Sequence, residues 1–346
     1  MNFDWLTPAW ESALAQRRRQ HHALLLHGPA GIGKSAFAQA LAQAWLCEAP
    51  LADGAACGRC VACGWFAQGN HPDFRLLAPA AAEEAEAADG AEAGGRQPGR
   101  AGAKSAKPSR DIRIDQVRAL ERFVGVGGHR GGCKVVLIDP ADALNAAAAN
   151  ALLKTLEEPS GATRFVLVTD RPDALPATVR SRCASLALPM PQAEAAIAWL
   201  VAETGADESS ARTWLAAAGG APLRARRFAD PAESATHRLI METLAGLPET
   251  GVVQAAEALT GIEAAVWLGV LQCWVADLQR VRAGAGPRFF PERAGRLGAL
   301  ARASSPAALD RLAMQLSALA RAVDHPLNPR LLIEDALLRV RAALAG

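Results

Sequence analysis

The sequence predicts an α/β domain built on a parallel β-sheet, followed by a part of the chain that contains helices and no strands. Up to about residue 189, short continuous apolar segments alternate with helical patterns, which is typical of strands buried on both faces of a parallel sheet. From Pro191 onward, apolar residues recur only at helical spacing. The chain has 346 residues, more than one compact core usually holds, so we expect two or three domains.

Four segments have the apolar composition of buried strands. They are ALLLH at 23–27, KVVLID at 134–139, RFVLVT at 164–169 and ASLALP at 184–189. A helix is predicted at 143–158, where apolar residues share one face and Pro159 ends the pattern. We expect Asp142 to begin this helix as its N-cap.

The C-terminal part of the sequence predicts helices of two kinds. Two short helices are expected between residues 191 and 220, and a longer helical region begins near residue 231. Four large apolar residues of that region recur at helical spacing: Trp267, Leu271, Trp274 and Leu278. This stripe indicates core packing more than a ligand-binding cage.

A phosphate-binding loop is the strongest functional signal. GPAGIGKS fits the pattern G-x-x-x-x-G-K-[ST] in full and lies between a predicted strand and a predicted helix. Glycine backbone N–H groups would surround phosphate oxygens, the lysine would neutralise the β- and γ-phosphates, and the serine would hold Mg²⁺. A glycine-rich turn that only caps a helix is the alternative. The residues expected to contact ATP and Mg²⁺ are Gly28, Gly31, Gly33, Lys34 and Ser35.

The predicted strand at 134–139 ends in Asp139, which is placed to reach Mg²⁺ from a second strand. Its alternative role is that of a turn residue. ATP-hydrolysing proteins of this type use a second carboxylate directly afterwards, but here the next residue is Pro140. Losing a positioned general base removes a factor of about 10² to 10⁴ in rate. The sequence therefore predicts nucleotide binding with little or no hydrolysis.

Four of the seven cysteines fall within 17 residues, in the pattern C-x9-C-x2-C-x2-C. They are Cys47, Cys57, Cys60 and Cys63. Four thiolates satisfy tetrahedral Zn²⁺ and leave no open position for chemistry, so we expect a structural zinc site. Free thiols or a redox pair are the alternatives. His71 lies outside the cluster and is expected to be a loop residue.

Other features limit what the chain can do alone. The segment 78–110 contains almost no large apolar residue, so we expect a disordered surface insertion. The formal net charge of +2 gives no bulk electrostatic reason for the chain to bind nucleic acid by itself. The sequence shows neither a signal peptide nor an apolar stretch of membrane-spanning length. We therefore expect a cytoplasmic protein.

Several motifs in order carry a family resemblance: HHALLLHGPAGIGKS, the cysteine cluster, HPDF, IRIDQVRAL, KVVLIDPADALNAAAANALLKTLEEP, RFVLVTDRPDALPATVRSRC and NPRLLIEDALL. Together they span nearly the whole chain outside the insertion, and they resemble the delta-prime subunits of bacterial DNA polymerase III clamp loaders, which are AAA+ proteins. The resemblance implies three domains. These are an AAA+ domain at 1–189 with a zinc module at about 47–64, a helical lid at 190–230 and a helical collar at 231–346.

The resemblance also implies partners and roles. Such subunits join tau/gamma and delta subunits in an open ring that loads the sliding clamp onto primed DNA. Arg182, in the SRC motif, matches an arginine finger offered to a neighbouring ATPase subunit, whereas composition alone favours a surface ion pair. Thr169 matches a residue that senses the γ-phosphate, or it is a strand-end threonine. Arg224 lies one step past the lid-arginine position of active relatives, so its contact with nucleotide stays undecided.

Two other functions fit part of the sequence. An autonomous tau/gamma-like AAA+ ATPase would use the same phosphate-binding loop. However, tau/gamma subunits carry Asp-Glu where this chain has Asp139-Pro140. A zinc-dependent DNA-binding module would use the cysteine cluster, but the near-neutral charge disfavours it.

Overall fold

The protein is represented by a computed structural model that describes residues 3–18, 21–80, 109–129, 132–322 and 328–344. The chain divides into two units, Met1–Met190 and Pro191–Gly346. The insertion expected at 78–110 lies almost entirely outside the described residues. No helix in the described part of the chain combines the length and apolarity that a membrane crossing requires.

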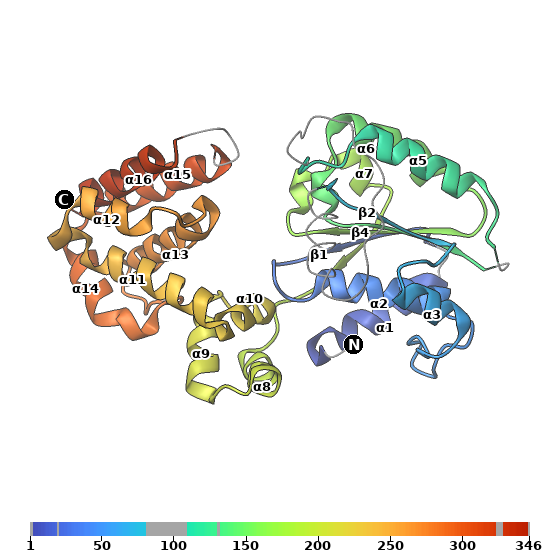
Figure 1. The fold of residues 1–346 in the computed structure, drawn as a ribbon, viewed down its shortest axis with the longest axis horizontal. Coiled ribbons are helices and arrows are strands. Elements are labelled where there is room, and N and C mark those ends of the chain that lie inside the picture. Colours follow the sequence, from blue (N-terminus) through green and yellow to red (C-terminus); the bar gives the residue numbers. More distant parts are fainter. Residues whose placement is uncertain (1–2, 19–20, 81–108, 130–131, 323–327, 345–346) are drawn as a thin grey trace, which may run out of the picture. The chain divides into compact units, whose positions relative to one another are not determined.

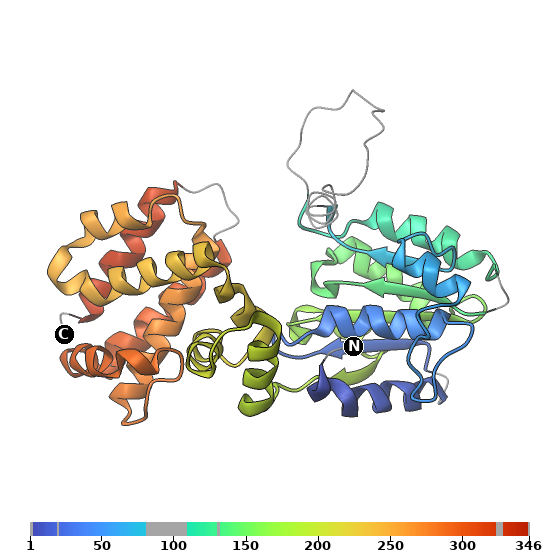
Figure 2. The ribbon, with the colours of Figure 1, turned by 60° about the horizontal axis from the view of Figure 1, so that its bottom comes forward.

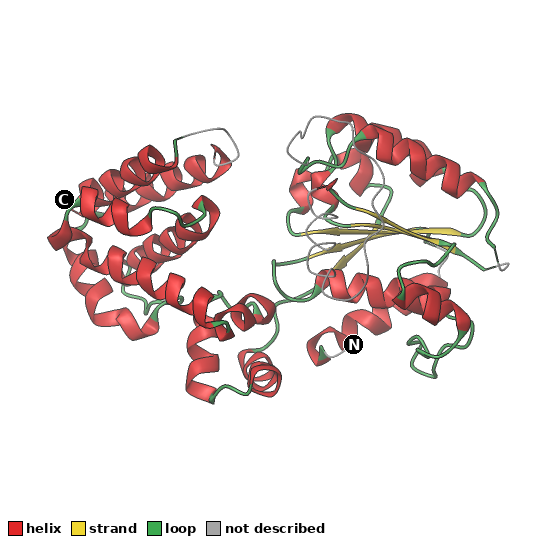
Figure 3. Cartoon of the chain, viewed as in Figure 1, coloured by secondary structure: helices red, strands yellow, loops and turns green. Residues whose placement is uncertain are grey.

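The first unit contains a five-stranded, fully parallel sheet, as the sequence predicts (Figure 3). In spatial order the strands are β2 (Phe74–Leu77), β3 (Lys134–Ile138), β4 (Thr163–Thr169), β1 (Ala23–His27) and β5 (Ala184–Ala187). Four of them are the predicted strands. The edge strand β2 has only four residues, and Arg75 interrupts its apolar run, so it lacks the signal of a buried strand.

Helices cover both faces of this sheet (Figures 1 and 2). One face carries α1 (Thr7–Arg18), α2 (Lys34–Leu46) and α3 (Val61–Ala67), and the other carries α5 (Ile114–Gly125), α6 (Ala146–Glu157) and α7 (Ala177–Arg180). Successive side chains of a strand point to opposite faces. Accordingly, Leu24 and Leu26 of β1 join the core under α2, whereas Leu25 joins the core under α5 and α6.

The start of α6 differs from the prediction. The N-cap is Asn145, whose side-chain oxygen accepts a hydrogen bond from the backbone N–H of Ala148 at 2.8 Å. Asp142 was expected in this role, but it lies in a short 3₁₀ turn, Ala141–Ala143, that precedes the helix. Its carboxylate accepts hydrogen bonds from Thr169 and Arg171. The 3₁₀ turn displaces the helix start by several residues and leaves Asp142 free for these contacts.

The described part of the second unit is helical. Three helices share a small core: α8 (Ala193–Thr204), α9 (Glu208–Ala217) and α10 (Pro222–Arg226). A larger core joins α11 (Pro231–Thr250), α12 (Val252–Leu259), α13 (Ala264–Arg282), α14 (Ala294–Ala303), α15 (Pro306–Ala322) and α16 (Pro329–Leu344). The tryptophan stripe of α13 lies inside this second core, with Trp267 and Trp274 almost fully buried. The prediction of core packing is confirmed.

A buried carboxylate fixes the segment that follows α13. Asp277 is fully buried, and its oxygens accept backbone N–H hydrogen bonds from Arg288 (2.6 Å), Phe289 (2.9 Å) and Phe290 (2.8 Å). Each of these hydrogen bonds goes to a charged acceptor, which makes it stronger than a neutral one. Asp277 therefore ties the loop that carries the buried Phe290 ring to α13.

Replacing this carboxylate should weaken the helical unit. Asp277→Ala leaves three backbone N–H groups without their acceptor, so we expect a loss of about 2–4 kcal/mol in the free energy of unfolding. Urea unfolding of the full chain, followed by circular dichroism, measures this loss. Glu242→Gln, an exposed change on α11 of the same unit, is the control and should leave the transition in place. Equal stability of the two variants would contradict the role of Asp277.

Candidate functional site

The phosphate-binding loop connects β1 to α2 at the carboxyl edge of the sheet. Gly28, Gly31 and Gly33 all have positive φ angles (155°, 76° and 101°). Gly33 is the N-cap residue of α2, so the amino end of this 13-residue helix opens onto the loop. Ser35 is exposed in the first turn of the helix. Backbone N–H groups at a helix N-terminus suit an anion, so the local geometry has the form that the motif predicts.

The loop is closely packed by other parts of the unit. A Cβ atom added to Gly28 would lie 2.2 Å from the carbonyl oxygen of Leu188, and one added to Gly33 would lie 2.9 Å from the Phe3 ring. Trp5 donates its indole N–H to the carbonyl oxygen of Ile32 at 3.1 Å. The N-terminal segment therefore covers part of the loop, a contact that no local sequence pattern predicts.

Lys34 is turned into the protein and is bound there. Its side chain is 4% exposed, and its ammonium donates to the carbonyl oxygen of Pro29 at 2.5 Å. The same ammonium forms an ion pair with Asp170, with 2.5 Å between Nζ and Oδ1. Asp170 directly follows β4. Sequence reasoning missed this residue, because an acid after a strand is common and its partner is more than a hundred positions away.

The sheet brings the predicted acidic and sensing residues to the edge that carries the loop. Asp139 follows β3, and Thr169 ends β4, which lies between β3 and β1. The buried Thr169 hydroxyl donates to Asp142 Oδ1 at 2.8 Å. Arg171 pairs with the other oxygen of Asp142, also at 2.8 Å. Pro140, joined to Asp139 by a cis peptide bond, occupies the position where a base is expected.

These contacts engage the one carboxylate of the 139–142 turn that is not expected to bind Mg²⁺. Asp142 is the only acid there besides Asp139, and it is committed to a hydroxyl and a guanidinium. A base must be free to accept a proton from water. Asp142 is therefore bound to other groups of the chain, and little or no hydrolysis by this chain stays a prediction.

Arg182 lies at the opposite edge of the same sheet. It precedes β5, which runs parallel to β1 with Ala187 beside His27. Arg182 lies in the turn before Ala184, the first residue of β5, and the strand itself spans roughly 10 Å from there to the level of the phosphate-binding loop. The Arg182 side chain therefore does not reach the loop of its own chain.

The Arg182 guanidinium is bound to its own chain at the surface. Nε donates to Oε1 of Glu157, the last residue of α6, at 2.7 Å, and a second nitrogen donates to the carbonyl oxygen of Thr178 at 2.8 Å. Its side chain remains 32% exposed and that of Glu157 is 48% exposed. The surface ion pair predicted from composition is therefore present, and the Arg182 side chain is partly open to solvent.

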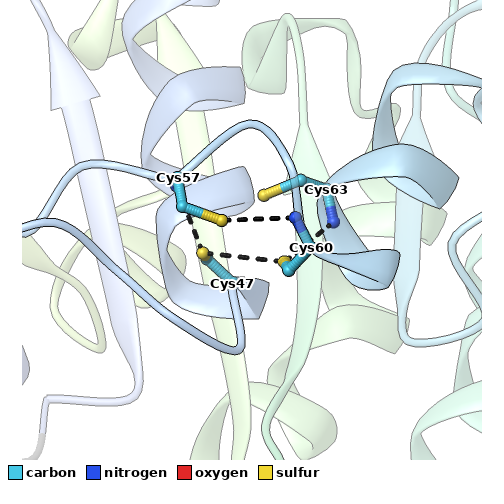
Figure 4. A group of neighbouring side chains, drawn as sticks. All are labelled: Cys47, Cys57, Cys60 and Cys63. Carbon is cyan, nitrogen blue, oxygen red and sulfur yellow. Dashed lines mark hydrogen bonds between the residues drawn. The ribbon is translucent and has the colours of Figure 1, made fainter.

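The four clustered cysteines converge in space (Figure 4). Their sulfur atoms all lie within 4.8 Å of one another, and the Sγ atoms of Cys47 and Cys60 are 3.9 Å apart. A tetrahedron of thiolates around Zn²⁺, with Zn–S bonds of about 2.3 Å, has sulfur–sulfur edges of about 3.8 Å. Cys47 follows α2 and Cys60 caps α3. The cluster thus joins these two helices and has the dimensions of a tetrathiolate metal site.

Backbone N–H groups donate hydrogen bonds to sulfur atoms of this cluster and so favour the thiolate forms that bind a cation. The N–H of Cys57 donates to the sulfur of Cys47 at 3.3 Å, and that of Cys60 donates to the sulfur of Cys57 at 3.3 Å. Desolvation raises the pKa of Cys60, but hydrogen bonds, the largest from the Cys63 N–H, outweigh it and lower that pKa to about 6. Desolvation and the neighbouring thiols raise the pKa of Cys63 to about 12. The pKa values of these neighbouring thiols are thus shifted in opposite directions. A bound divalent cation would favour the thiolate form of both.

His71 stays outside the cysteine cluster, as expected. Its Nδ1 accepts the backbone N–H of Asp73 at 3.1 Å, and burial lowers the pKa of the ring, which favours its uncharged form. The ring packs edge-on against Trp65. These contacts assign His71 to the turn before β2.

The chain is similar to known proteins in both of its units. Residues 7–192 match the family described as "DNA polymerase III, delta subunit", and residues 237–342 match "DNA polymerase III, delta subunit, C terminal". Over 165 residues the chain is also 33% identical to DNA polymerase III subunit tau of Salmonella typhimurium, covering 48% of this chain and 21% of that protein.

Two relatives carry the name delta-prime. The chain is 44% identical over 227 residues to DNA polymerase III subunit delta' of Pseudomonas aeruginosa, a match that covers 65% of this chain and 61% of that protein. It is 30% identical over 343 residues to the Escherichia coli subunit delta', which covers 98% of this chain and 95% of that protein. The chain therefore belongs to the delta-prime family of DNA polymerase III subunits.

Proposed function

We propose that this chain is a structural and regulatory subunit of a clamp loader. It assembles with tau/gamma and delta subunits and assists the ATP-driven loading of the sliding clamp onto primed DNA. The α8–α10 helices at 190–230 act as a lid, and the helices at 231–346 act as the oligomerising collar. DNA is held by the assembly, in keeping with the net charge of +2 on this chain.

One observation carries the division of labour in this proposal. The phosphate-binding loop and Arg182 occupy opposite edges of one parallel sheet, so neither serves the other within the chain. An accessible guanidinium at such an edge suits a phosphate on a neighbouring subunit, since arginine binds phosphate oxygens in a forked geometry. We assign Arg182 as an arginine finger supplied in trans. Glu157 holds the guanidinium until the neighbouring subunit presents its nucleotide.

The loop itself is assigned to nucleotide binding without turnover. Gly28, Gly31 and Gly33 provide backbone donors, Lys34 and Ser35 reach the phosphates and Mg²⁺, and Asp139 approaches from β3. Thr169 would sense the γ-phosphate only after giving up its hydrogen bond to Asp142. Pro140 stands where a second carboxylate is usual, and Asp142 is bound to Thr169 and Arg171, which disfavours an autonomous ATPase.

The finger assignment predicts a loss of activity in the assembly. In a complex reconstituted with tau/gamma and delta subunits, Arg182→Ala should leave assembly intact. DNA-stimulated ATP hydrolysis in the adjoining site should fall by on the order of 10³, because the missing cation no longer stabilises the transition state. A phosphate-release assay on the assembled complex measures this rate.

The matched control is Arg180→Ala, two residues earlier, which removes a guanidinium paired with Asp173. We expect the control complex to keep its ATPase rate. Unchanged hydrolysis by the Arg182→Ala complex would refute the finger role, whereas failure to assemble would assign Arg182 to the interface.

The cysteine cluster is assigned to structural zinc held by Cys47, Cys57, Cys60 and Cys63. We expect one Zn²⁺ per chain. We expect Cys60→Ser to lose it, because the variant removes one of the four thiolate ligands. The connection between α2 and α3 should then become sensitive to protease. Elemental analysis together with limited proteolysis measures both effects.

Cys133→Ser is the control for zinc binding, since Cys133 lies outside the cluster and its sulfur donates to the carbonyl oxygen of Trp45 at 3.4 Å, a bond that serine can keep. The control should retain zinc. Purified chain that holds no zinc, and whose proteolysis does not respond to a chelator, would contradict the assignment.

A further inference from the structure

The Lys34 ammonium is paired with an anion that belongs to the chain. Its side chain is 4% exposed, and Asp170 Oδ1 lies 2.5 Å from Nζ. A buried ammonium without a counter-charge is strongly unfavourable, because it loses its hydration and no ion pair compensates for the loss. Asp170 therefore stabilises the inward position of Lys34. It pairs with the same ammonium that a bound phosphate would contact.

The sheet places Asp170 next to the loop that carries Lys34. Thr169, the preceding residue, pairs with His27 of β1, so Asp170 lies beside the first residues of the phosphate-binding loop. Neighbouring charges in its segment are turned elsewhere, since Arg171 binds Asp142 and Asp173 binds Arg180. The Asp170 side chain is 49% exposed, so its carboxylate can move into water while Lys34 stays in place.

We propose that Asp170 is an affinity-determining residue of the phosphate-binding loop, acting as an internal competitor for Lys34. A bound phosphate must replace the Asp170 carboxylate at the ammonium. The free energy of the lost Lys34–Asp170 ion pair therefore offsets part of the binding free energy. A ligand with one negative charge gains at Lys34 no more than Asp170 already provides. A magnesium-bound triphosphate also gains the backbone donors of the loop and the helix N-terminus. Asp170 thus selects for polyphosphates and keeps their affinity low.

This inference rests on the proposed nucleotide binding at the loop, and a calorimetric titration of the full chain with Mg–ATP tests it. Asp170→Asn keeps the shape of the side chain and removes its charge. We expect the Kd for Mg–ATP to fall on the order of ten-fold. Asp170→Ser should act in the same direction, and Asp170→Glu, which keeps the charge, should bind nearly as the unchanged protein does.

Two controls separate competition for Lys34 from a general effect of charge. Asp173→Asn removes an exposed carboxylate from the same segment and should leave the Kd unchanged. In the Lys34→Ala background, Asp170→Asn should bring no gain, because the competed group is gone. A gain that persists without Lys34, or an equal gain from Asp173→Asn, would show plain repulsion of phosphate and overturn the proposal.

The outcome is distinguishable from failure of the proposed subunit function. If neither the unchanged chain nor Asp170→Asn binds Mg–ATP while the chain still assembles with tau/gamma and delta subunits, the inference on Asp170 is wrong and the subunit function stands. If Asp170→Asn tightens binding through Lys34 but the chain does not assemble with those subunits, the inference stands and the subunit function is wrong.

Discussion

The common direction of the five strands is the constraint on which the first unit depends. In a parallel sheet, every segment that follows a strand lies at one edge, and every segment that precedes a strand lies at the other. The phosphate-binding loop, Asp139 and Asp170 therefore share an edge although they are far apart in sequence. Arg182 precedes its strand and is held at the other edge. One topological property thus separates the glycine-rich loop from Arg182.

The two cationic side chains assigned to phosphate binding are each paired with a carboxylate of the same chain. Lys34 pairs with Asp170, and Arg182 pairs with Glu157. In each pair the acid is about half exposed, so the carboxylate can turn fully into water if a phosphate replaces it. The two pairs differ in the cation, since Lys34 is buried and Arg182 is partly open to solvent. This difference suits a ligand inside the chain in one case and a ligand outside it in the other.

Local patterns were enough to predict four strands, the loop, the cysteine cluster and the buried stripe of α13, because each depends on spacing within a short segment. The features that escaped prediction depend on distant partners. Asp170 meets a lysine from another strand–helix connection, and Phe3 covers the loop from the start of the chain. The edge strand β2 is too short for an apolar pattern, and the 3₁₀ turn before α6 moved the cap from Asp142 to Asn145.

The tight approach of Leu188 to Gly28 affects how such motifs are interpreted in related chains. Even a methyl group at Gly28 would collide with that carbonyl oxygen, and its φ angle of 155° already disfavours other residues. Glycine is therefore demanded by the join between β1 and the segment after β5, whether or not nucleotide ever binds. A related chain that does not bind ATP would still need this glycine, so its presence alone carries no information about the ligand.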